Sequence, residues 1–266
     1  MTAHKYQQGI IGNCAYLAHI DTESDIRWMC WPKFDSSFIF GNLLDEEHGG
    51  HFFIKPNHTD FTTEQYYITN TNILCTEFTA PDGRFRVVDF APRFYQYERH
   101  FRPLMLFRKV ELLEGNPQIV VCCEPVGDYG NIKPESYIGS NHIRYLGLKK
   151  PVRLTTGFPL SHVLSKRPIF LNQTNYLCLS WGIPLEAPLE STAEDFLRNT
   201  REYWQNYINM AAIANFRQKS IIRSILALKL HQFEDTGAII AASTSSLPEY
   251  PGQGRNWDYR YCWLRD

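Results

Sequence analysis

The side chains best suited to chemistry in this sequence lie at its C-terminal end. Residues 255–266 read RNWDYRYCWLRD, so tryptophan and tyrosine rings are interleaved with guanidinium and carboxylate groups. An aromatic face can cover the C–H surface of a sugar ring, while a planar guanidinium and a carboxylate can bind its hydroxyl groups. This pattern indicates a sugar-binding loop. Because the sequence stops within the cluster, we expect it to be part of a larger enzyme.

Other catalytic motifs are missing from the sequence. It has no Cys-x-x-Cys pair, no Gly-x-Ser-x-Gly elbow and no phosphate-binding Gly-x-x-x-x-Gly-Lys loop. His48 and His51 flank two glycines without a third ligand nearby, which favours a turn over a metal site. The acidic residues that could be considered for acid–base chemistry have no recognisable partner; they are Glu234, Asp235, Glu249 and Asp258. We therefore assign neither a catalytic residue nor a metal ligand within this chain.

Composition and charge exclude several classes of function. The chain has 266 residues, of which 44% are hydrophobic and 14% aromatic, as expected for one large or two ordinary globular domains. Its formal net charge of −1 argues against a nucleic-acid or anionic-membrane partner. No segment approaches the roughly 20 apolar residues of a membrane helix. The 7 cysteines lack regular spacing, which favours a reducing, cytoplasmic location over a disulfide framework.

The first two thirds of the chain have the pattern of a β-protein. Up to about residue 190, short apolar and aromatic runs are separated by turn residues, which is typical of an antiparallel β-sandwich. Asp82-Gly83 lies between two alternating runs and predicts a hairpin over residues 75–90. The other runs that predict strands are residues 25–31, 50–54, 104–113, 119–124 and 176–181.

After residue 190 the apolar residues recur about every 3.6 positions, which indicates helices. Ser191-Thr-Ala-Glu194 has the spacing of a capping box and predicts the start of the first helix. A second helix is predicted from about residue 216 to 233, with Gly237 as its stop. Its apolar stripe has no obvious full set of partners in the sequence, so we expect much of it to be exposed.

Both ends of the sequence resemble bacterial glycoside hydrolase family 15, which includes glucoamylases, glucodextranases and trehalases. Residues 241–249 and 254–266 are similar to the opening of the family's catalytic domain. The N-terminal half resembles the family's trehalase-like β-sandwich. The segments that carry this second resemblance are 11–14 (IGNC), 27–32 (RWMCWP), 34–36 (FDS), 40–41 (FG), 43–45 (LLD), 49–50 (GG), 70–74 (NTNIL) and 88–93 (VDFAPR). Together they cover essentially the whole chain in the family's order.

The resemblance implies a fold that is mainly β and then α. An antiparallel β-sandwich would occupy residues 1–190 and a helical linker residues 191–212. Residues 213–266 would then form the first, truncated part of an (α/α)6 catalytic barrel.

The resemblance also implies a binding site for the non-reducing glucose. Tyr259 and Trp263 would offer ring surface, while Arg265 and Asp266 would hydrogen-bond the hydroxyls. For Trp257 and Tyr261, packing at the rim of a core is an equal alternative. In the family, both catalytic glutamates lie beyond the position of Asp266. No cofactor is needed for hydrolysis by two carboxylates, although some trehalases of the family are thought to depend on magnesium and phosphate.

Two classes of function follow. The first is inverting hydrolysis of α-glucosidic bonds, glucoamylase-like on α-glucan or maltooligosaccharide, with trehalose hydrolysis by a trehalase of the same family as the alternative. In this interpretation the partner of the chain is a missing C-terminal barrel segment, and the 266 residues alone are inactive. The second class is a non-catalytic β-sandwich that serves as an interaction or folding module.

Overall fold

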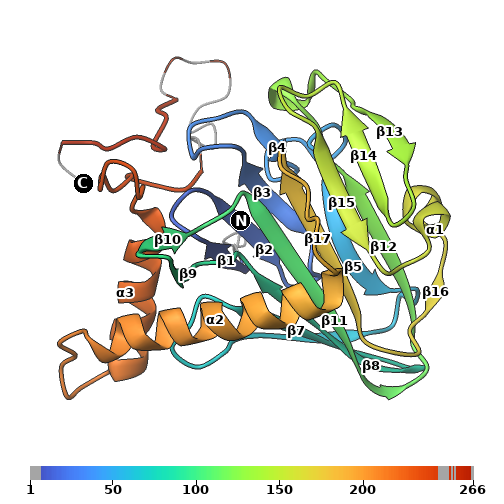
Figure 1. Ribbon diagram of the computed structural model, residues 1–266, viewed down its shortest axis with the longest axis horizontal. Helices are drawn as coiled ribbons and strands as arrows, with labels where there is room; N and C mark the ends of the chain where they lie inside the picture. The colour runs from blue at the N-terminus through green and yellow to red at the C-terminus, as the bar shows by residue number, and fades with distance from the viewer. Residues whose placement is uncertain (1–6, 245–251, 253, 255, 265–266) are drawn as a thin grey trace.

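The computed structural model describes residues 7–244, 252, 254 and 256–264, and within this part of the chain the fold is mainly β (Figure 1). The largest sheet has eight antiparallel strands in the order β13-β14-β15-β17-β11-β8-β7-β6. Their bounds are β6 Thr62–Tyr67, β7 Leu74–Ala80, β8 Gly83–Phe90, β11 Met105–Gly115, β13 Glu135–Ile138, β14 His142–Leu146, β15 Val152–Thr156 and β17 Asn175–Trp181.

Smaller antiparallel sheets face the large one. A four-stranded sheet has the order β1-β2-β3-β4, and a three-stranded sheet has the order β16-β12-β5. A separate hairpin pairs β9 with β10. Their bounds are β1 Gln8–Gly12, β2 Leu17–Asp21, β3 Ile26–Cys30, β4 Phe38–Phe40, β5 His51–Pro56, β9 Phe94–Gln96, β10 Arg99–Phe101, β12 Gln118–Glu124 and β16 Ile169–Phe170. Short helical turns lie at η1 Asp128–Gly130 and α1 Leu160–Ser165.

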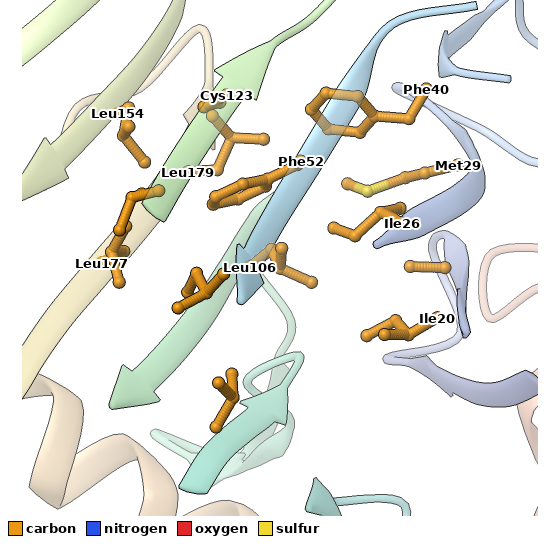
Figure 2. Packing of buried hydrophobic residues seen from close by; sticks show 14 of the residues in the cluster. Ile20, Ile26, Met29, Phe40, Phe52, Leu106, Cys123, Leu154, Leu177 and Leu179 are labelled. Atoms are coloured by element: carbon orange, nitrogen blue, oxygen red, sulfur yellow. The ribbon is translucent and has the colours of Figure 1, made fainter. Parts of the chain in front are cut away.

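The main hydrophobic core fills the space between these layers (Figure 2). Met29 and Phe40 come from the four-stranded sheet, Phe52 from the three-stranded sheet, and Leu106 and Leu179 from the eight-stranded sheet. All five side chains are fully buried. Because two antiparallel sheets bury their facing side chains against each other, the arrangement is that of a β-sandwich.

The strand predictions agree well with the structure. The predicted hairpin is β7 and β8, whose register ends at the pair Ala80 and Gly83. Gly83 has φ +154, and a Cβ at this position would lie 2.4 Å from the Glu114 carbonyl oxygen, so the close approach of the neighbouring strand requires glycine. The sequence analysis did not predict β13. All four of its residues are exposed, so it lacks the alternation that marks a half-buried strand.

One ion pair lies inside the sandwich and joins its layers. Arg108 on β11 pairs with Asp89 on β8 at 2.7 Å, and both side chains are fully buried. The remaining N–H groups of Arg108 donate to the Phe52 carbonyl oxygen at 2.7 Å and to the Ser24 carbonyl oxygen at 2.6 Å. These acceptors belong to β5 and to the turn between β2 and β3, so a single guanidinium connects three sheets.

Helix α2, Leu189–Asn209, packs on the outer face of the eight-stranded sheet (Figure 1). It begins two residues before the predicted capping box, directly after Pro188, so the prediction that Ser191 caps the helix was wrong. The Ser191 hydroxyl instead donates to the Pro188 carbonyl oxygen. The carboxylate of Glu194 is occupied by the sheet, since it accepts a hydrogen bond from the Tyr176 hydroxyl at 2.7 Å and pairs with Lys109 at 2.6 Å.

Helix α3, Gln218–His231, is shorter than predicted at both ends. Gly237 does not end it, because the backbone is already extended at Gln232, and Gly237 instead lies in the turn that brings Gln232 and Ile239 together. The apolar stripe is better covered than expected. Leu226 and Leu230 are buried in a cluster with Leu17 of β2 and with α2, whereas Leu228 is 60% exposed. In the described part of the chain, no helix is long and apolar enough to cross a membrane.

Prediction for the buried ion pair: replacing Asp89 by asparagine should lower the free energy of unfolding by about 3–5 kcal/mol, because the Arg108 charge would stay buried without its partner. Denaturant unfolding monitored by tryptophan fluorescence measures this change. The matched change Asp195→Asn breaks an exposed pair with Arg198 on α2 and should cost less than about 1 kcal/mol. Equal midpoints for the two variants would contradict the importance of burial.

Candidate functional site

The sugar-binding loop predicted from the sequence places two of its rings together. Tyr259 and Trp263 are stacked, with ring centroids 5.1 Å apart and an interplanar angle of 28°. Trp257 meets Trp263 edge to face at 6.2 Å. The Trp263 indole N–H donates to the Asp258 carbonyl oxygen at 3.0 Å, which fixes the orientation of its ring. The result is a small aromatic platform held by its own backbone.

Arg260 clamps this loop to the end of the sandwich. Its guanidinium is buried and donates to the Ser36 carbonyl oxygen at 2.6 Å and the Phe34 carbonyl oxygen at 3.3 Å. It also pairs with Asp258 at 2.8 Å and lies over the Trp28 ring. Burial acts to raise the pKa of Asp258, but the hydrogen bonds from Arg260 outweigh it and hold that pKa below its ordinary value. Both partners therefore stay charged at neutral pH.

A second segment of the chain braces the loop. The amides of Ala241 and Ala242 donate to the carbonyl oxygens of Tyr261 and Tyr259 at 3.0 and 2.8 Å. The Trp28 indole N–H in turn donates to the Ser243 carbonyl oxygen at 2.9 Å. Segment 240–243 thus lies between the aromatic platform and β3, and Figure 1 shows the C-terminal segment beside this end of the sandwich.

His19 on β2 holds the same segment through its ring. Its Nε2 lies 2.7 Å from the Ser243 hydroxyl and its Nδ1 lies 3.2 Å from the Gln8 side-chain oxygen. Burial, with a smaller contribution from the charge of His231, lowers the pKa of His19 to about 4. The ring is therefore neutral at pH 7. A neutral, fully enclosed histidine between a serine and a glutamine acts as a structural connector.

The acidic residues at the end of α3 are anchors as well. Glu234 pairs with the fully buried Arg93 at 2.8 Å and with His100 at 3.1 Å. Arg93 also donates to the Asn13 carbonyl oxygen at 3.0 Å and faces the Tyr203 ring of α2. Burial acts to raise the pKa of Glu234, but the charge of Arg93 outweighs it, so this pKa lies below its ordinary value. A carboxylate held ionised in this way is unsuited to act as a general acid.

The remaining acidic candidates give no catalytic pair. Asp235 forms an ion pair with Arg102, and Asp258 is engaged by Arg260. Glu249 lies outside the described residues. His48 and His51 pair separately with Asp45 and Asp25. Among the residues that the structure describes, no three His, Cys, Asp or Glu side chains come together as a metal site.

The structure describes only some of the site residues that were predicted from the sequence. The structure brings Tyr259 and Trp263 together, whereas Arg265 and Asp266 lie outside the described residues. Trp257 and Tyr261 are 50% and 51% exposed, which fits both alternatives, the rim of a core and a sugar-binding surface. Sequence reasoning missed the role of Arg260. Its signal was present in the pattern Asp-Tyr-Arg, since residues two apart in an extended segment share a face, but the acceptors on the sandwich could not be read from the sequence.

A β-sandwich that carries a clamped aromatic loop at its end matches the class expected from the resemblance, the N-terminal portion of a glycoside hydrolase. Residues 5–161 match the family described as trehalase-like, N-terminal, and residues 215–266 match glycosyl hydrolases family 15. The first match spans more than half of the chain. The chain therefore belongs to the trehalase-like N-terminal family, followed by a segment of glycosyl hydrolases family 15, and the resemblance stated from the sequence is confirmed.

The relatives that the chain matches are longer proteins. The chain is 31% identical to a trehalase of Thermoplasma volcanium, in an alignment that covers 97% of this chain and 42% of that protein. It is 32% identical to a trehalase of Thermoplasma acidophilum, over 91% of this chain and 42% of that protein. A trehalase of Mycolicibacterium smegmatis is 28% identical, with 97% and 42% covered. The chain thus spans about two fifths of the length of these relatives.

Prediction for the clamp: replacing Arg260 by methionine should release the aromatic platform, because the buried stem remains while the hydrogen bonds to the sandwich are lost. We expect the amides of residues 258–263 to exchange with deuterium about tenfold faster or more, the effect of losing ~1.4 kcal/mol of local stability. Hydrogen-exchange mass spectrometry measures this. Tyr261→Ala is the matched control, since its half-exposed side chain forms no hydrogen bond or ring contact with the described residues. Unchanged protection in the Arg260 variant would contradict the clamp.

Prediction for pH dependence: His19 should make the fold less stable as the pH falls. Between its ordinary pKa of 6.5 and its folded pKa of about 4, the unfolded chain binds a proton that the folded chain does not. The contribution present above pH 6.5 is lost over this window and amounts to roughly 3 kcal/mol. Unfolding free energies measured from pH 7 to 4 should fall less steeply for His19→Gln, and parallel curves for the two proteins would disprove the assignment.

Proposed function

We propose that this chain is the N-terminal portion of an inverting α-glucosidase whose substrate is trehalose. The observation that carries the proposal is the aromatic platform of Tyr259 and Trp263, clamped by Arg260 to a sandwich of the trehalase-like family. An aromatic surface suits the C–H face of a glucosyl unit. Fixing it in advance lowers the entropy lost when the sugar binds.

The role of the described residues is binding and positioning. Tyr259 and Trp263 cover a glucose face, while Arg260 and Asp258 hold the loop and remain charged. Arg265 and Asp266 would add donors and acceptors for the sugar hydroxyls, as the family resemblance implies. Protonation of the leaving oxygen and activation of water need two further carboxylates, which we place in the barrel segment that follows residues 213–266 in the longer relatives.

Trehalose is favoured over α-glucan by the names of the relatives. Those of Thermoplasma and Mycolicibacterium are called trehalases. The sequence analysis had put glucoamylase-like activity first and trehalase second, and the comparisons support the reverse order. Maltooligosaccharide remains the second candidate because glucoamylases belong to the same family. The non-catalytic interaction module has no support from these relatives.

We also propose a reducing, cytoplasmic location and a three-part organisation of sandwich, linker and barrel. All seven cysteines are described and all are free, with six of them buried. Burial raises the pKa of the Cys178 thiol and of the Cys122 thiol above the ordinary value, so these thiols stay protonated and unreactive. The packing of α2 against the sheet supports its role as the linker, and α3 would be the first helix of the barrel.

Prediction for activity: the 266-residue chain should release no glucose from trehalose or maltotriose, whereas the protein extended by the barrel should cleave trehalose. In the extended protein, Trp263→Ala should lower kcat/KM by about tenfold to a hundredfold, because a ring face lost from the glucose site costs ~1.4–2.7 kcal/mol. Tyr97→Ala on the β9–β10 hairpin, outside this loop, is the control and should stay close to wild type. A glucose-oxidase assay measures all four cases.

Two results would overturn this proposal. Glucose release by the 266-residue chain alone would show that its own residues suffice for catalysis. Equal kcat/KM values for the Trp263 and Tyr97 variants would remove the platform from the sugar site. A strong preference for maltotriose would leave the site in place and change the substrate to an α-glucan.

A further inference from the structure

A cavity lies in the sandwich itself, next to Arg260, the residue that clamps the C-terminal loop. Its volume is about 600 Å³, within the range of small-molecule sites. It is lined by Trp31 and Trp181, which meet edge to face at 6.2 Å, and by Phe38 and Tyr129, which meet edge to face at 5.6 Å. Phe38 of β4 and Trp181 of β17 thus converge on one pocket with Trp31, which directly follows β3, and Tyr129 of η1. Trp31, Phe38 and Trp181 are only 2%, 4% and 7% exposed and form its closed floor, whereas the Tyr129 ring is 52% exposed and offers a face to a ligand.

The charged groups of this cavity balance one another. Asp35 and Asp128 are matched by Lys33 and Lys149, and all four residues are exposed at its mouth. Within the part of the chain that the structure describes, the side chains of Asp35 and Lys149 form neither an ion pair nor a hydrogen bond. Their oxygen and nitrogen atoms are therefore available to a ligand. A neutral ligand with several hydroxyl groups fits this balance better than an anion or a cation.

Two neighbouring residues at the mouth of the cavity have a strained backbone conformation. Asp128 and Tyr129 have φ values of +46° and +56°, a region that few residues other than glycine adopt. The Tyr129 amide donates to the Ser37 hydroxyl at 2.8 Å, and Arg260 lies 3.4 Å from its ring hydroxyl. These contacts maintain the strain and keep the half-exposed ring over the cavity. Strain that is maintained in this way is commonly found at binding sites.

From these observations we propose that the cavity binds one pyranose unit of a neutral α-glucoside, with the exposed Tyr129 ring against the sugar ring and Asp35 and Lys149 on its hydroxyls. Arg260 belongs to both sites, since it contacts Tyr129 here and Asp258 in the loop that carries the aromatic platform. The sandwich thereby becomes a sugar-binding surface in its own right. This inference goes beyond the proposed hydrolysis, because binding in the cavity requires no catalytic residue.

The test is a titration of the 266-residue protein with trehalose and with methyl α-glucoside, followed by ligand-observed NMR. Both sugars should bind with a dissociation constant in the millimolar range. Tyr129→Gly removes the ring at a position where glycine accepts the backbone conformation, and Asp35→Asn removes a charge that has no partner in the described structure. Each change should weaken binding by about fivefold or more.

The chain offers a matched control for each variant. Tyr97 is also exposed and has φ +49°, and it lies on the distant β9–β10 hairpin, so Tyr97→Gly repeats the first change away from the cavity. Asp60→Asn repeats the second at another exposed aspartate. Both controls should bind like the wild type. Thermal unfolding of all four variants establishes that each is folded.

Three results would overturn the proposal. The first is the lack of saturable binding in the millimolar range. The second is equal weakening by the variants and their matched controls. The third is binding that Trp263→Ala removes while Tyr129→Gly and Asp35→Asn leave it unchanged. That third result would place the sugar on the aromatic platform, so the proposed function would stand while the cavity lost its role.

Discussion

The structure depends on one constraint, that a guanidinium taken out of water must find a carboxylate and carbonyl acceptors nearby. Three buried arginines meet it by connecting parts of the chain that are distant in sequence. Arg108 joins the layers of the sandwich, Arg93 fixes the end of α3, and Arg260 fixes the C-terminal loop. Because removing an acceptor would leave a buried charge unpaired, each connection has a defined geometry. The apolar core supplies stability, and these three groups determine which segments meet.

The same principle explains how a sandwich without a catalytic pair among its described residues would contribute to the proposed sugar site. The loop that carries Tyr259 and Trp263 is held in position by hydrogen bonds from Arg260 to carbonyl oxygens of the 34–36 segment. That segment also borders the aromatic cavity. The loop and the cavity therefore share one rigid support. A platform that is fixed before the sugar arrives loses less entropy on binding than a mobile one.

The strands were predictable where the alternation of buried and exposed residues is strong, as in the β7–β8 hairpin with its Asp82-Gly83 turn. Exposed β13 gave no such signal. The helix boundaries were less predictable because tertiary contacts changed them. The carboxylate of Glu194, expected to cap α2, is used by Tyr176 and Lys109 of the sheet. Likewise, the apolar stripe of α3 packs against Leu17 of the sandwich.

The sequence by itself determined the chemical type of the loop, the family and the change from strands to helices, because these depend on residue types and local periodicity. Only the tertiary structure decided which carboxylates are held in ion pairs and which are available for chemistry. Glu234 and Asp258 could have been catalytic candidates by residue type, yet each is neutralised by an arginine. The partner of Glu234, Arg93, lies 141 positions away along the chain, and local patterns carry no information about such a contact.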